Sequence, residues 1–164
     1  MMEEHKPNFR IPDPPRGVKA IPWRLPIWIF RLHLGWLLGH RMLLLTHRGR
    51  ISGQSRQAVL EVVKYEKANN IHYVVSGFGE KSQWFQNIMN NPEVTIQVGN
   101  HSLKTFAERL SADEGEKIFN EYQQRYPNAI KNLSKLIGYQ LGESDEDLRV
   151  FFRAIPVIRL QPRN

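Results

Sequence analysis

The sequence contains no cysteine, and this absence excludes several kinds of chemistry at once. Disulfide bonds, thiolate nucleophiles and zinc sites with cysteine ligands are all ruled out. Residues 1–16 also lack the apolar segment of a signal peptide, so we predict a cytoplasmic protein. Neither a G-x-G-x-x-G motif nor strand-helix alternation occurs, which argues against a Rossmann domain.

Acidic residues are scarce in the first third of the chain. Residues 1–60 hold ten Lys and Arg against three Asp and Glu, whereas residues 61–164 hold thirteen of each. The whole net charge of +7 therefore lies in the first 60 residues. Such a distribution indicates an anionic partner, which could be a phosphate on a small molecule, a membrane surface or a nucleic acid.

Length and prolines suggest how the chain is organised. At 164 residues it fits a single domain with its own core, which we place at residues 21–164. Residues 1–20 are predicted to form an extended arm, because prolines deny both helix and central strand. These prolines are Pro7, Pro12, Pro14 and Pro15.

Residues 21–40 are dense in Trp, Leu and Ile but are interrupted by Arg24, Arg31 and His33. These interruptions argue against a membrane span. We expect a helix that starts near Pro26 and covers one end of the core. A basic helix that lies on a lipid surface is the alternative.

The rest of the chain predicts an antiparallel α+β domain. Valine-rich or alternating segments joined by short turns predict strands at residues 42–47, 57–65, 71–76, 94–98 and 102–108, with a closing strand at 155–160. A short helix is expected before Pro92, and Ser111 with Glu114 forms a capping box that opens another helix. Further helices follow at residues 127–137 and 145–153. Strands that pair through short hairpins, with helices before and after them, are typical of the α+β class.

The stretch THRGRISGQSR, residues 46–56, has the composition of a phosphate-binding loop. Gly49 and Gly53 permit turns whose backbone amides face outward. Ser52 and Ser55 add hydroxyl donors, and Arg50 and Arg56 each offer a planar fork to phosphate oxygens. A solvated hairpin without a ligand is the alternative reading.

A second cluster, SGFGEKSQWFQN, follows the third strand. Gly77 and Gly79 allow a flat ligand to approach the backbone, and Phe78 and Trp84 provide apolar faces for an extended ring. Phe85 is expected in the core instead.

These two runs, LLLTHRGRISGQSRQAVLEVV and YVVSGFGEKSQWFQNIMNNPEVTIQVG, together resemble the deazaflavin-dependent nitroreductase and quinone reductase family. The resemblance covers about residues 35–110 and implies an antiparallel split β-barrel, related to folds that bind flavin mononucleotide (FMN). It implies a cofactor site whose residues are Gly49, Arg50, Ser52, Gly53, Arg56, Ser76, Gly77, Phe78, Gly79, Trp84 and Asn87. Ile51 stands where the family has lysine, so FMN, with its shorter tail, remains the alternative to coenzyme F-420.

The resemblance also implies an activity, which is hydride transfer from a reduced deazaflavin to a quinone or a nitroaromatic acceptor. Tyr139 is a candidate proton donor, with solvent as the alternative. A barrel that binds flavin, haem or lipid without catalysis is the competing function. The family implies a homodimer, and we expect neither nucleic-acid binding nor a metal. His47 and His72 are isolated in predicted strands and are expected to be structural.

Overall fold

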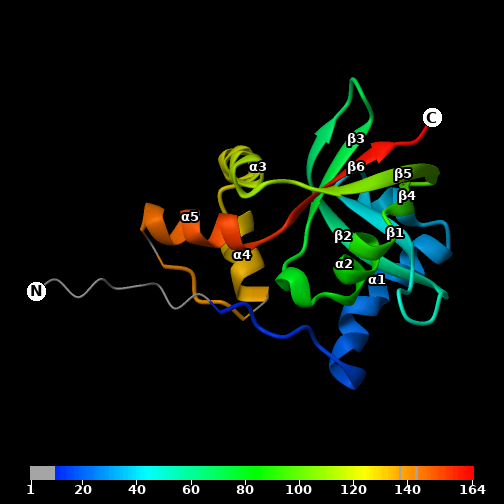
Figure 1. The fold of residues 1–164 in the computed structure, drawn as a ribbon, viewed down its shortest axis with the longest axis horizontal. Coiled ribbons are helices and arrows are strands. Elements are labelled where there is room, and N and C mark those ends of the chain that lie inside the picture. Colours follow the sequence, from blue (N-terminus) through cyan, green and yellow to red (C-terminus); the bar gives the residue numbers. More distant parts are fainter. Residues whose placement is uncertain (1–9, 137, 143) are drawn as a thin grey trace, which may run out of the picture.

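The computed structural model describes residues 10–136, 138–142 and 144–164. Six antiparallel strands in these ranges close into a barrel in the order β1-β2-β3-β6-β5-β4 (Figure 1). They are β1 (Met42–Arg48), β2 (Ser55–Glu66), β3 (Ile71–Val75), β4 (Glu93–Val98), β5 (His101–Arg109) and β6 (Val157–Pro162). The predicted antiparallel barrel with flanking helices is confirmed.

Strand alternation places one core inside the barrel. Along β1, Leu43, Leu45 and His47 are buried at alternate positions, so their side chains share the inward face. Leucine, isoleucine and valine from the other strands complete this core. Helix α2 (Gln83–Asn90) adds Phe85 and Ile88 to it, and both side chains are almost fully buried. The short helix therefore packs on the barrel core through one apolar face.

A second core lies outside the barrel, under three helices. These are α3 (Ala112–Arg125), α4 (Ala129–Leu136) and α5 (Asp145–Ala154), which gather on one side of the barrel in Figure 1. Phe119 stacks on Phe152 at 4.9 Å between ring centroids, and both pack against the outward residues Val63 and Tyr73. Ile137 of the predicted helical face lies outside the described residues.

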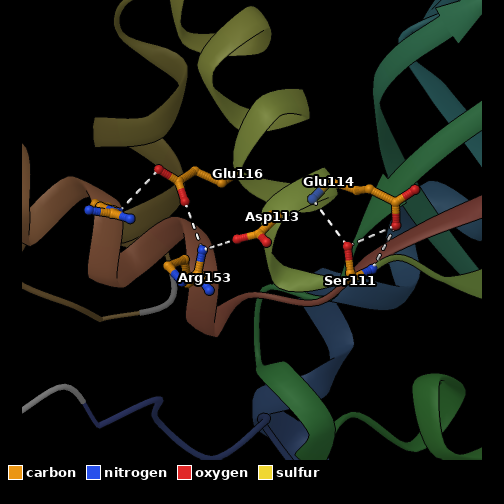
Figure 2. Close-up of polar contacts among 6 residues, drawn as sticks. Ser111, Asp113, Glu114, Glu116 and Arg153 are labelled. Atoms are coloured by element: carbon orange, nitrogen blue, oxygen red, sulfur yellow. Dashed lines mark hydrogen bonds and ion pairs between the residues drawn. The ribbon is translucent and has the colours of Figure 1, made fainter.

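Polar contacts hold the ends of α3 and α5 together (Figure 2). The Ser111 hydroxyl accepts from the Glu114 N–H and the Glu114 carboxylate accepts from the Ser111 N–H, which is the predicted capping box. Arg153 of α5 donates to Asp113 at 2.6 Å and to Glu116 at 3.0 Å, both on α3. Arg153 is thus paired with two carboxylates.

Helix α1 (Ile21–Arg31) differs from its prediction at the start. It begins five residues before Pro26, because Pro22 occupies the first turn, where a helix needs no N–H donor. Phe30 is only 2% exposed, so the helix does cover one end of the core. The short 3-10 turn η2 (Gly35–Leu38) follows it.

The predicted arm is only partly extended. Residues 10–16 have no regular secondary structure, whereas η1 (Gly17–Ala20) forms a 3-10 turn after the positive φ of Gly17. Lys81 holds the extended part by donating to the Ile11 carbonyl and to Asp13. Residues 1–9 of the predicted arm lie outside the described residues.

Candidate functional site

A groove of about 1050 Å³ lies where the β1–β2 loop, α2 and α1 meet. We call it the arginine groove, because three guanidinium groups line it and, among the described residues, no carboxylate does. Its lining residues are Ile27, Arg31, His47, Gly49, Arg50, Ile51, Ser52, Ser55, Arg56, Gln57, Ala58, Gln83, Trp84 and Asn87. Six of the eleven sequence-predicted cofactor residues are among them.

The β1–β2 loop forms a compact turn that brings its backbone to the groove. The Gly49 N–H donates to the Gln54 carbonyl at 2.8 Å, and the Gly53 N–H donates to the Gly49 carbonyl at 2.8 Å. Gly53 has a φ of +68°, a conformation that favours glycine. A Cβ at Gly49 would lie 2.8 Å from the Ser52 hydroxyl, so the loop closes tightly over this glycine.

Neutral amides hold Arg50 against α2. Its backbone N–H donates to Asn87 Oδ1 at 3.0 Å, and its guanidinium Nη1 donates to the same oxygen at 3.0 Å. Nη1 also donates to Gln83 Oε1 at 3.0 Å, one helical turn earlier. Because both side-chain partners are uncharged, Arg50 keeps its full positive charge for a ligand.

The other two guanidinium groups of the groove are likewise free of carboxylates. Arg31 on α1 donates from Nε and Nη2 to Gln57 Oε1, at 3.3 and 3.1 Å. The Arg56 side chain on β2 has neither a hydrogen-bond nor an ion-pair partner among the described residues. Uncompensated arginines at one site favour binding of an anion that carries several oxygens, such as a phosphate or carboxylates.

His47 lies at the inner wall of the groove and is 6% exposed. Burial and the nearby positive charge of Arg56 lower the pKa of His47 to about 4, so the ring is neutral at pH 7. Its Nδ1 lies 3.3 Å from Asn87 Nδ2. Since Asn87 Oδ1 already accepts from Arg50, Nδ2 is the donor in this contact and His47 Nδ1 the acceptor.

The sequence-predicted cluster at residues 76–79 does not join the groove. The Ser76 hydroxyl is fully buried and donates to the Gly79 carbonyl at 2.6 Å. Gly79 has a φ of +62°, and a Cβ there would lie 2.6 Å from Ile11 Cδ1. Gly77 is absent from the groove lining, and Phe78 packs on the helical core. This turn is accounted for by chain packing, and its contact with a cofactor stays a prediction.

Gly53 and Tyr139 also lie outside the groove lining. Gly53 shapes the loop from behind, through its positive φ. Tyr139 stacks on Phe151 at 5.5 Å within the helical core. Burial raises the pKa of Tyr139. Its side chain packs against the helical core and does not line the groove.

Sequence reasoning missed four polar residues of the groove, which are Arg31, His47, Gln57 and Gln83. His47 carried a signal, because it continues the inward alternation of Leu43 and Leu45 and so had to face the barrel interior. Gln83 lies four residues before Asn87, which places both side chains on one face of a helix. The sequence gives no signal for Arg31 and Gln57, since α1 and β2 meet only in the folded chain.

A smaller hollow of about 510 Å³ lies elsewhere, between Arg41, Glu61 and the α3–α4 connection. The Glu61 carboxylate there accepts from Arg41 and from the buried Tyr122 hydroxyl. Burial, and then that hydrogen bond, raise the pKa of Tyr122. Because Glu61 compensates Arg41, this hollow is less suited to an anionic ligand than the arginine groove.

Within the described ranges, no three His, Asp or Glu side chains converge in a way that could hold a metal ion. Among the described helices, none is both long and apolar enough to cross a lipid bilayer.

Solved structures agree with the barrel. The chain is similar to an F-420-H2 dependent reductase (FDR-A), with a TM-score of 0.51 and 24% identity over 75% of this chain and 96% of that one. It is similar to the haem storage protein HutZ of Vibrio cholerae, with a TM-score of 0.51 and 14% identity over 86% and 92% of the two chains. At these identities the likeness carries the fold alone, and the predicted split-barrel class is confirmed.

The sequence comparisons establish the family. The model of the F-420H(2)-dependent quinone reductase family matches residues 32–137. The chain is also 30% identical, over 81% of its length and 99% of the relative, to the Mycobacterium tuberculosis protein Rv3178, whose name proposes an F-420H(2)-dependent quinone reductase activity. This chain therefore belongs to the F-420H(2)-dependent quinone reductase family. Its class is that of deazaflavin-dependent reductases, and FMN is not needed to account for it.

Proposed function

We propose that the arginine groove binds reduced coenzyme F-420 and that the chain transfers hydride from it to a quinone. The observation that carries this proposal is a groove of about 1050 Å³ whose lining, in the described part of the chain, has three arginines and no carboxylate. Family membership supports the choice of coenzyme. A nitroaromatic acceptor remains the second candidate, from the predicted resemblance.

The residues of the groove suit the two chemical halves of such a cofactor. Arg50, Arg56 and Ser52 surround the tight loop at Gly49, and this donor set fits a phosphate and an anionic tail. Trp84 and Ile27 provide apolar surface that fits an extended ring. Ile51, which replaces the usual lysine, is 89% exposed and brings no charge to the groove. Arg31 and Arg56 supply positive charge there in place of that lysine.

When bound, the reduced deazaflavin supplies a hydride from its C5 carbon. The chain's own residues would bind and orient: the arginines hold the anionic part, and Trp84 on α2 supports the ring. We assign the proton for the reduced acceptor to solvent. Tyr139, the other candidate, packs on Phe151 in the helical core and does not line the groove.

A fluorescence titration of the purified protein with F-420, and separately with FMN, tests the cofactor proposal. We expect saturable F-420 binding in the micromolar range and much weaker FMN binding. Tight binding of FMN with none of F-420 would overturn it. Oxidation of reduced F-420 upon addition of a quinone then tests the activity, with a nitroaromatic compound as the second acceptor.

We also propose that α1 and η2 contact an anionic lipid surface. Trp28, Leu32, Trp36 and Leu37 are between 57% and 65% exposed. No acidic residue occurs between Asp13 and Glu61, while Arg31 lies over the Trp28 ring at 5.1 Å. Exposed aromatic and apolar side chains beside uncompensated cations are typical of interfacial helices.

Co-sedimentation with liposomes tests the lipid proposal. The paired variant Trp28→Ser with Leu32→Ser should lose most binding to vesicles that contain anionic lipid. Phe106→Ser removes another exposed apolar side chain and serves as the matched control, because Phe106 lies on β5 and belongs to neither α1 nor η2. Equal binding by both variants would contradict the role of α1.

The predicted homodimer remains a proposal as well. A solved structure described as a domain-swapped dimer shares 23% identity and a TM-score of 0.54 with this chain, which carries the fold only. The exposed apolar side chains of α1 and η2 supply a physical reason for self-association as well as for lipid contact. Light scattering should give twice the chain mass of 19.2 kDa, and a monomer mass would contradict the dimer.

A further inference from the structure

We propose that Asn87 and His47 are positioning residues, which hold the Arg50 loop in its ligand-binding conformation instead of contacting the cofactor themselves. This inference rests on the proposed function, since it takes the arginine groove to be the F-420 site. It differs from the sequence-based expectation, in which Asn87 lies beside the deazaflavin ring.

Three of the four hydrogen-bonding positions of the Asn87 amide are used inside the protein. Its Oδ1 accepts two hydrogen bonds, from the backbone N–H and from Nη1 of Arg50, each at 3.0 Å. Its Nδ2 donates to His47 Nδ1 at 3.3 Å. An amide oxygen has two lone pairs, and both are therefore taken by Arg50. The side chain is 5% exposed, which leaves little of it for a ligand.

His47 fixes the orientation of this amide. A neutral imidazole has one nitrogen that accepts and one that donates. Because Nδ1 accepts from Asn87, the proton of the neutral ring is on Nε2. Reversal of the Asn87 amide would place Nδ2 against the Arg50 donors, so a His47 that accepts at Nδ1 also keeps Asn87 Oδ1 toward Arg50.

The resulting chain of contacts joins three elements. His47 belongs to β1, Arg50 to the β1–β2 loop and Asn87 to α2. Trp84 lies on the same helix, three residues before Asn87. The contacts thus set the loop that supplies Arg50 and Ser52 in register with the helix that supplies Trp84, so the anion-binding and ring-binding parts of the groove keep a fixed separation.

Two variants of His47 separate positioning from direct contact. In His47→Asn, the new side-chain oxygen stands near the former Nδ1 and can accept from Asn87, whereas His47→Leu offers no acceptor. We expect His47→Asn to bind F-420 about tenfold more tightly than His47→Leu, the scale of one buried hydrogen bond. Equal affinities, or a weaker His47→Asn, would overturn the proposal, because an acceptor at the Nδ1 position would then make no contribution to F-420 binding.

The tautomer of His47 gives a test that needs neither a variant nor a cofactor. Two-dimensional ¹⁵N spectra of the wild-type protein should show His47 protonated at Nε2 and unprotonated at Nδ1 between pH 6 and pH 8. A ring protonated at Nδ1 would overturn the proposal. Failure of F-420 to bind would refute the proposed function, while this spectrum would still report on the contact between Asn87 and His47.

Discussion

Arginines at the two sides of this molecule meet opposite surroundings. In the arginine groove, Arg31 and Arg50 are held by glutamine and asparagine oxygens, and Arg56 has no partner among the described residues. Beside α3 and α5, Arg153 meets Asp113 and Glu116 (Figure 2). Arg149 also meets Glu116, at 3.4 Å. Amide partners fix an arginine without compensating its charge, whereas carboxylates remove its attraction for an anion. The same residue type thus serves binding on one side and helix packing on the other.

The largest effect is expected from Arg56→Ala. Loss of a guanidinium that has no competing carboxylate should weaken F-420 binding by roughly 1.5 to 3 kcal/mol. Fluorescence titration measures the affinity, and a circular dichroism melt shows whether the fold is kept. An unchanged affinity would contradict the assignment of Arg56 to the cofactor's anionic part.

Acid should lower the free energy of unfolding through protonation of His47. The pKa of His47 is about 4 in the folded chain against 6.5 for a free histidine. The unfolded chain therefore binds more protons between these values, and stability falls as the pH falls. Between pH 7.5 and pH 5 the loss should be about 2 kcal/mol from this group. Urea unfolding of the wild type and of His47→Asn across this pH range isolates the contribution of His47 to the free energy of unfolding. Parallel pH profiles for the two proteins would contradict the prediction.

A smaller effect is expected from Gln83→Glu, which gives Arg50 the kind of partner that Arg153 has. Gln83 Oε1 already accepts from Arg50 at 3.0 Å, so a carboxylate there should pair with the guanidinium. F-420 affinity should fall by about 1 kcal/mol, while the fold is kept. Gln86→Glu adds the same charge to the same helix, three residues further on and outside the groove lining, and serves as the matched control. Equal losses in both variants would point to general repulsion of the cofactor.

The smallest effect on binding is expected from Arg153→Ala. It removes the two carboxylate contacts that join α5 to α3, of which Asp113 lies at the surface and Glu116 is partly buried. The melting temperature should fall slightly, and the affinity for F-420 should stay within error of the wild type. A marked loss of affinity would show that the two sides are coupled, and would break the contrast between them.

Much of this site could be predicted because local rules set its parts. The glycines and arginines of residues 46–56 favour a turn with exposed cations, and a tryptophan and an asparagine three apart lie on one face of the helix predicted before Pro92. Contact between Arg50 and Asn87 joins positions 37 residues apart, and only the family resemblance brought them together beforehand. The roles of residues 76–79 stay a prediction, because glycines serve a tight turn and a ligand approach equally. Here Ile11, from a segment 68 residues earlier, covers Gly79, and composition does not reveal such a contact.

A crystal structure of the protein with bound F-420 tests the central claim most directly. The account predicts the coenzyme in the arginine groove, with its phosphate or tail at Arg50 and Arg56, its ring beside Trp84, and Asn87 still bonded to Arg50. A coenzyme bound outside this groove, or held by Asn87 in place of Arg50, would contradict it.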